Sequence, residues 1–178
     1  FRFMLNKLKN KKKITHTVNG YTADQIMQKV AHAGLHPAGM FFPDTYHFTA
    51  GTTDLEMLRR AYHKMQQVAQ QQWPERAANL PYKCFYQALI VASLIETEAA
   101  KASERKLIAS VLLSRFQKHM RLQVDTTVLY GLAKPYGSKV LPADLKVKTP
   151  YNTYLHRGLP PTPIAMPGLA SIHAALHL

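Results

Sequence analysis

Two glutamates near the middle of the chain carry the side chains best suited to acid–base chemistry. Glu96 directly follows a nearly continuous apolar run, Ala88 to Ile95, and Glu98 comes two positions later. An apolar environment disfavours the ionised form of a carboxyl group, so an acid placed there can hold a proton near neutral pH and donate it. The pattern leaves a structural alternative open, in which Glu96 caps its helix or binds an arginine.

The spacing of the two glutamates argues against a paired site on one helix. Residues at i and i+2 point about 200° apart around an α-helix. Glu96 and Glu98 therefore cannot flank one glycosidic bond as a pair of carboxyl groups. If a second carboxylate is needed, it has to come from elsewhere in the chain. Asp125 is the nearest candidate by pattern, and a turn-capping role is its alternative.

Side chains that suit carbohydrate binding lie on a later segment, Tyr151-Asn-Thr-Tyr154. The two tyrosine rings can stack on pyranose faces, and the amide of Asn152 can bind hydroxyl or acetamido groups. The alternative is a packed loop held by a tyrosine hydroxyl, and the residues alone do not decide between the two interpretations.

Other chemistries lack a supporting motif. The chain contains no GxxxxGK[ST], GxGxxG, GxSxG or HExxH pattern. Two histidine pairs, His32/His36 and His173/His177, have no third ligand nearby, so we expect no metal site.

The elements that must position these residues follow from periodicity and capping signals. Capping boxes begin at Thr22 and Thr53. We expect helices over 23–33, 54–72, 84–100, 104–119 and 169–177, a short strand over 120–124, and mainly loop over 134–168. The helix over 84–100 is apolar nearly all round and should be buried. The pattern favours an α+β fold in which this central buried helix carries Glu96, flanked by amphipathic helices and short strands.

The bulk composition indicates a globular chain with an anionic partner or surface. The 178 residues include 23 lysines and arginines but 10 acids, for a net charge of +13. Part of this excess is a basic cluster in the first thirteen residues, which we interpret as a solvated segment or a patch beside an anionic membrane surface. We expect no nucleic acid partner, because no recognition motif accompanies the charge. A single cysteine, Cys84, excludes an internal disulfide.

Several long motifs, in a consistent order over roughly residues 39–177, resemble the endolytic murein transglycosylase family, also called MltG or YceG-like. The motifs are Phe41-Phe-Pro-Asp-Thr-Tyr46, Ala92-Ser-Leu-Ile-Glu-Thr-Glu98, Glu104-Arg105, Met120-Arg-Leu-Gln-Val-Asp-Thr-Thr-Val-Leu-Tyr-Gly131, Pro150-Tyr-Asn-Thr-Tyr154 and Gly158-Leu-Pro-Pro-Thr-Pro-Ile-Ala-Met-Pro-Gly168. Such a series is far more specific than any one of its members.

The resemblance implies that Glu96 is the catalytic residue and that Glu98 supports it. It places Gln123, Asp125, Tyr151 and Asn152 around the substrate cleft. It implies cleavage of nascent peptidoglycan glycan strands between N-acetylmuramic acid and N-acetylglucosamine. The cut leaves 1,6-anhydro ends and limits strand length, without a metal or organic cofactor. The alternative is a catalytically weak or inactive peptidoglycan-binding or scaffold domain of the same fold.

The resemblance also implies a place and a domain division. The family acts at the periplasmic face of the bacterial inner membrane, near peptidoglycan synthases. We expect residues 1–38 to be a basic segment with the remnant of a LysM-like subdomain. Residues 39–178 are expected to be a YceG-like catalytic domain that lacks its C-terminal part, so the family domain is truncated at both ends. Thr126 departs from the family pattern, because a proline is usual there.

Overall fold

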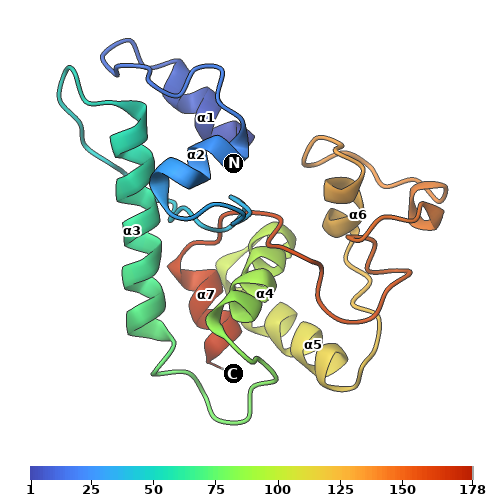
Figure 1. The fold of residues 1–178 in the computed structure, drawn as a ribbon. Coiled ribbons are helices and arrows are strands. Elements are labelled where there is room, and N and C mark those ends of the chain that lie inside the picture. Colours follow the sequence, from blue (N-terminus) through green and yellow to red (C-terminus); the bar gives the residue numbers. More distant parts are fainter. Residues whose placement is uncertain (178) are drawn as a thin grey trace.

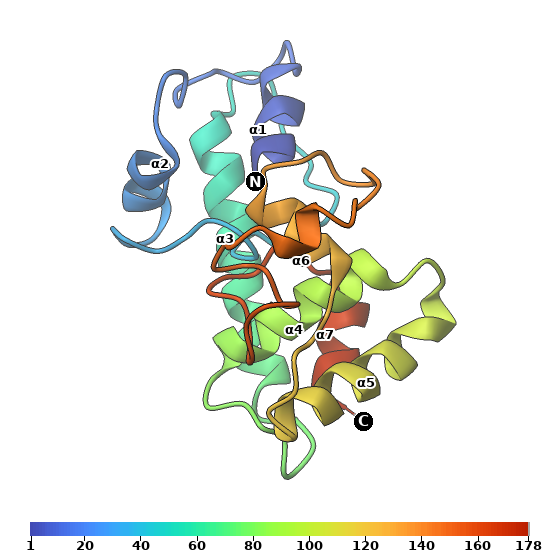
Figure 2. The same ribbon diagram turned by 90° about the vertical axis from the view of Figure 1, so that its right-hand side faces the viewer.

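The computed structural model describes residues 1–177, which form helices joined by long loops (Figures 1 and 2). The α-helices are α1 (Arg2–Lys9), α2 (Ala23–Val30), α3 (Asp54–Gln72), α4 (Phe85–Glu98), α5 (Arg105–Gln117), α6 (Asp125–Gly131) and α7 (Leu169–Leu176). Two short 3₁₀ turns, η1 (Ala102–Glu104) and η2 (Asp144–Lys146), complete the regular structure of this part of the chain.

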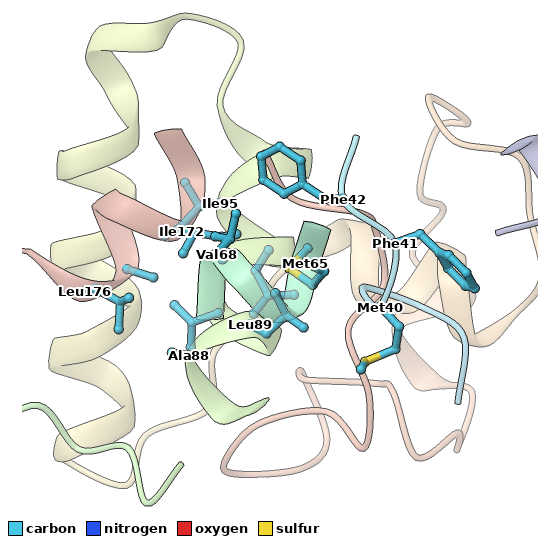
Figure 3. Packing of buried hydrophobic residues seen from close by; sticks show 14 of the residues in the cluster. Met40, Phe41, Phe42, Met65, Val68, Ala88, Leu89, Ile95, Ile172 and Leu176 are labelled. Atoms are coloured by element: carbon cyan, nitrogen blue, oxygen red, sulfur yellow. The ribbon is translucent and has the colours of Figure 1, made fainter. Parts of the chain in front are cut away.

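Helix α4 lies at the centre of the molecule, as the sequence predicts. Its residues from Ala88 to Ile95 are all buried, and it packs against α7, α5 and α6. Figure 3 shows Ile95 beside Ile172 of α7 and Val68 of α3. This apolar packing fixes the end of α4, and therefore Glu96, relative to the C-terminal helix.

Helices α2 and α3 begin at the two predicted capping boxes. The Thr22 hydroxyl accepts from the Gln25 N–H and the Gln25 side chain accepts from the Thr22 N–H, at 3.2 and 2.9 Å. Thr53 and Glu56 form the same reciprocal pair, and α3 has the predicted bounds. Helix α2 ends at Val30, three residues before its predicted end, because Ala31 leaves the helical region at φ −142°.

The strands of the α+β expectation are not found among residues 1–177, where the β-type pairing is one isolated bridge between Thr15 and Thr53. The α+β class is therefore not confirmed. The strand predicted over 120–124 is wrong. Gln123 has a φ of +55°, which a regular strand cannot contain, and the Gln123 N–H donates to the Thr153 carbonyl at 3.1 Å. The segment is extended, but it is held by a loop instead of a neighbouring strand.

The segment before α2 is joined to α3 by a buried carboxyl group. Asp54 is only 1% exposed and accepts from the N–H and hydroxyl of Thr17 at 2.9 and 2.6 Å. Burial alone would raise the pKa of Asp54, but the hydrogen bonds from Thr17, Val18 and Leu55 outweigh it and hold the pKa below its usual value. Val18 and Ile26 join the same apolar cluster as α4.

Of the remaining helices, two lie where the sequence predicts them and two others were not expected. Helices α5 and α7 match the segments predicted over 104–119 and 169–177 to within two residues. Helices α1 and α6 were not predicted. None of the helices described here is long and apolar enough to cross a bilayer.

Candidate active site

Glu96 lies half-buried in the last turn of α4, with one carboxyl oxygen held by the start of α7. Glu96 Oε2 accepts from the backbone N–H of Gly168 at 3.1 Å and from the Ser171 hydroxyl at 2.6 Å. Gly168 is the N-cap of α7. The first amides of a helix have no partner inside it and its dipole favours negative charge there, so α7 supplies a ready binding site for one carboxylate oxygen.

Arg105, the first residue of α5, completes this arrangement through the same serine. Its Nε donates to Ser171 Oγ at 3.1 Å, so the hydrogen of the serine hydroxyl is directed to Glu96. Two ion pairs of the described side chains are His16–Asp54 and Lys134–Asp144, and neither includes Glu96. The structural alternative of a direct arginine–Glu96 pair is therefore not found in the described chain.

Both hydrogen bonds to the Glu96 side chain end on Oε2, so Oε1 accepts none from the side chains that the structure describes, those of residues 1 and 4–177. The start of α7 therefore holds one carboxyl oxygen of Glu96 in place and orients the group.

Glu98 faces a different element, as its spacing from Glu96 predicts. Glu98 Oε1 accepts from the Thr126 hydroxyl of α6 at 2.8 Å, and Thr126 Oγ1 also lies 3.0 Å from Thr97 Oγ1. A residue without a side-chain hydroxyl at position 126 could not donate to Glu98, so this contact between α4 and α6 depends on Thr126. Glu96 and Glu98 do not form a pair.

Asp125 is exposed at the first position of α6 and is bound by a tyrosine. The Tyr154 hydroxyl donates to Asp125 Oδ1 at 2.5 Å. This hydrogen bond, helped by burial and by the negative charge of Asp125, raises the pKa of Tyr154 to about 12. Tyr154 therefore acts as a hydrogen-bond donor over the ordinary pH range, and its loop is held by the tyrosine hydroxyl.

Gln123, two residues before Asp125, has an unusual backbone conformation, with a φ of +55°. Its positive φ places a non-glycine residue in the left-handed region, at a cost of about 1–2 kcal/mol. Its side chain is exposed and lines, with Glu98 and Arg115, a pocket of about 340 Å³. Asn79, His119 and Ala133 share this positive φ, so the place of Gln123 at a substrate cleft stays a prediction.

Tyr151 and Asn152 mainly organise the neighbouring loop. Asn152 is completely buried; its Nδ2 donates to the carbonyls of Leu145 and Val147 at 3.1 and 2.8 Å. The Tyr151 hydroxyl lies 2.9 Å from Thr162 Oγ1. Both amide hydrogens of Asn152 are used inside the protein, so this residue supports the loop and does not present its N–H groups to a ligand.

The structure adds contacts around the two glutamates that the sequence did not indicate. They are made by four residues, of which all but Ser171 lie within the motifs named in the sequence: Gly168, Ser171, Arg105 and Thr126. Gly168 and Ser171 lie 72 and 75 residues after Glu96, and Thr126 lies 28 residues after Glu98. Gly168 ends one of the family motifs, but no local pattern links it to Glu96.

The model of the YceG-like family matches residues 2–178. The chain belongs to the YceG-like family. It is 41% identical over 143 residues to a Bacillus subtilis protein named endolytic murein transglycosylase, covering 80% of this chain and 39% of that protein. A Streptococcus pneumoniae protein of the same name is 31% identical over 144 residues, covering 78% of this chain and 26% of that protein.

The fold is also that of a YceG-like protein of known structure. A crystal structure of a putative yceG-like protein from Listeria monocytogenes aligns with a TM-score of 0.69 at 33% identity. The alignment covers 98% of this chain and 53% of the Listeria chain. The chain thus spans about half of that structure and a smaller share of the curated relatives.

Proposed function

We propose that this YceG-like chain is part of a lytic endotransglycosylase that cleaves peptidoglycan glycan strands, with Glu96 as its acid and base. The observation that carries the proposal is the Glu96 carboxyl group, whose Oε2 is fixed by Gly168 and Ser171 while Oε1 accepts no hydrogen bond from the described side chains. The relatives named endolytic murein transglycosylase support the same conclusion.

The proposed reaction uses one carboxyl group twice and needs neither a second carboxylate nor water. Protonated Glu96 gives its proton to the glycosidic oxygen between N-acetylmuramic acid and N-acetylglucosamine, and the bond from that oxygen to the anomeric carbon breaks. Positive charge develops at the anomeric carbon. Ionised Glu96 then removes the proton from the muramyl C6 hydroxyl, whose oxygen bonds to the anomeric carbon. The products are a 1,6-anhydro end, a free hydroxyl on the leaving strand and Glu96 in its starting state.

The contacts at Oε2 suit this cycle. When Glu96 gives up its proton, the carboxylate gains charge that the Gly168 N–H and the Ser171 O–H can bind. The same two donors fix the direction in which Oε1 points. Glu96 would therefore return to one geometry after each turnover, which is how orientation lowers a barrier.

The wider setting completes the proposal. We place the activity at the periplasmic face of the bacterial inner membrane, on nascent strands near peptidoglycan synthases, where it limits strand length. The basic cluster of the first thirteen residues would face the anionic membrane surface. The division at residue 38, with a LysM-like remnant before it and the catalytic domain after it, belongs to this same proposal.

The test is digestion of purified peptidoglycan followed by mass analysis of the products. The chain should release muropeptides with 1,6-anhydro ends, and Glu96→Gln should lower the rate by about 10²–10⁴-fold, the usual contribution of general acid–base catalysis. Glu75→Gln is the matched control, because Glu75 is an exposed glutamate outside the site. Cleavage at the full rate by Glu96→Gln would contradict the proposal. Binding of glycan by the unaltered chain without any cleavage would instead support the inactive binding domain.

A further inference from the structure

Tyr136 combines an exposed ring with a fixed hydroxyl. The residue is 74% exposed, yet its hydroxyl donates to the backbone carbonyl of Thr97 at 3.0 Å. Thr97 directly follows Glu96 in the last turn of α4, where helix carbonyls have no partner inside the helix. The hydroxyl therefore satisfies the end of α4 and leaves an aromatic surface in solvent beside the turn that carries Glu96.

Contacts between its two ends hold the loop that carries Tyr136 in place. Lys134 Nζ bonds both carboxyl oxygens of Asp144 at 2.7 and 2.6 Å, and Asp144 also accepts from the Leu141 N–H. These contacts close the segment between residues 134 and 144. A ring that is already oriented loses less freedom when a ligand binds, which favours recognition.

A small pocket adjoins the ring and offers hydrogen-bond acceptors. Its volume is about 170 Å³, and its lining includes Tyr136, Thr97, Thr126 and Tyr130. The single hydroxyl hydrogen of Thr126 is directed to Glu98, and that of Thr97 to the carbonyl of Ser93 or Leu94 or to Thr126. Both hydroxyl oxygens keep free lone pairs and have no spare hydrogen, so the pocket suits a ligand that donates an N–H or O–H.

We propose that Tyr136 and this pocket form a binding subsite for one N-acetylated pyranose of the glycan. The ring packs against a face of the sugar, because aromatic faces are both apolar and electron-rich. The threonine oxygens accept from the acetamido N–H. The subsite rests on the proposed function, since it assigns a substrate residue to the surface beside Glu96, but sugar binding can be measured without turnover.

The test uses the Glu96→Gln chain, which separates binding from cleavage, titrated calorimetrically with a β-1,4-linked tetramer of N-acetylglucosamine. Tyr136→Ala should weaken binding about tenfold, the size expected for loss of one aromatic contact. Tyr136→Phe keeps the ring and loses only the hydroxyl, so it should bind far better than Tyr136→Ala. A role limited to capping α4 predicts that the two variants are equally affected. Melting temperatures check that each variant is folded.

Two controls define the assignment. Tyr21→Ala removes another tyrosine, which is 39% exposed. Its ring contacts Lys29 of α2, away from Glu96, so this variant should leave binding unchanged. A glucose tetramer of the same linkage, which lacks the acetamido group, should bind at least tenfold more weakly. No binding by the parent chain, equal binding by Tyr136→Ala, or equal affinity for the two tetramers would overturn the subsite. Absence of cleavage by the unaltered chain would count against the proposed function alone.

Discussion

Ser171 separates the Glu96 carboxyl group from a permanent positive charge. Arg105 donates to the serine oxygen, and the serine hydrogen goes to Glu96. A guanidinium in direct contact would form a bidentate pair that occupies both carboxyl oxygens. With the serine between them, Arg105 orients Glu96 through one carboxyl oxygen only.

Ser171→Ala tests this positioning role. The variant keeps the Gly168 contact and loses the 2.6 Å bond from the hydroxyl. We expect kcat for peptidoglycan cleavage to fall about 10- to 150-fold while KM is kept, since a charge-assisted hydrogen bond contributes about 1.5–3 kcal/mol. Tyr82→Phe is the control, because it removes a buried hydroxyl that binds the other end of α7 at Ala175. That control should lower the melting temperature without changing kcat; a similar kcat for both variants would contradict the role of Ser171.

Tyr154 gives a second prediction at this scale, from its raised pKa of about 12. Because this pKa is higher than that of an unfolded tyrosine, near 10, the Tyr154–Asp125 contact stabilises the fold fully below about pH 10. The contribution is lost as the pH rises toward 12. The difference in unfolding free energy between the unaltered chain and Tyr154→Phe should therefore shrink between pH 10 and 12 in denaturant titrations. A constant difference over that range would exclude the contact as its source.

At the scale of elements, the sequence predicted those helices whose signals are local. The capping boxes at Thr22 and Thr53 involve residues three apart, so they can be found without knowing the fold. Helix α6 has no side-chain cap and begins with Asp-Thr-Thr-Val, whose β-branched residues disfavour helix. The extended segment before it has the alternation of a strand, but alternation cannot show whether a partner strand exists.

Asp54 provides a prediction for the junction of the N-terminal segment with α3. Asp54→Asn should destabilise the chain by about 2–3 kcal/mol at pH 7. The amide nitrogen of asparagine would replace one of the two oxygens, which accept hydrogen bonds from Thr17 and Val18. The pKa of Asp54 is lower in the fold than in the unfolded chain. Its contribution is therefore present above about pH 4 and is lost as the pH falls through the folded pKa.

The measurement is the unfolding free energy of both chains from pH 7 down to pH 2. The gap between them should narrow below about pH 4. Asp44→Asn is the control, since Asp44 is exposed and accepts from the N–H of its neighbour Thr45. A gap that persists unchanged into acid would show that the charge of Asp54 is not what matters.

At the scale of the whole molecule, the candidate site was predictable only in part. The residues gave Glu96 as a plausible acid, which stays a prediction, and excluded its pairing with Glu98, which the contacts of the two side chains with different helices confirm. They could not give Ser171 or Arg105, because these contacts join elements 66 to 75 residues apart. Periodicity describes one element at a time, so it cannot state which helix end will face which side chain.

Gly39 shows how closely distant segments meet. It has a φ of +77°, and a Cβ there would lie 2.6 Å from Cγ of Pro163. Gly39→Ala should therefore cost about 2–4 kcal/mol, the sum of backbone strain and overpacking. Gly34→Ala isolates the first term, because Gly34 has a φ of +81° with nothing near its missing side chain. Equal melting temperatures for the two variants would contradict the close approach of these segments.

The hydrogen bonds from α7 to Glu96 also set an order of events during synthesis. Gly168 and Ser171 follow Glu96 by 72 and 75 residues, and a ribosome releases a chain from its N-terminus. A nascent chain whose Ser171 has not yet emerged from the ribosome contains Glu96 without the groups that orient its carboxyl group. Contacts of such sequence separation also form slowly in refolding. Glu96 therefore gains these two contacts only after helix α7 has been synthesised and has docked beside α4.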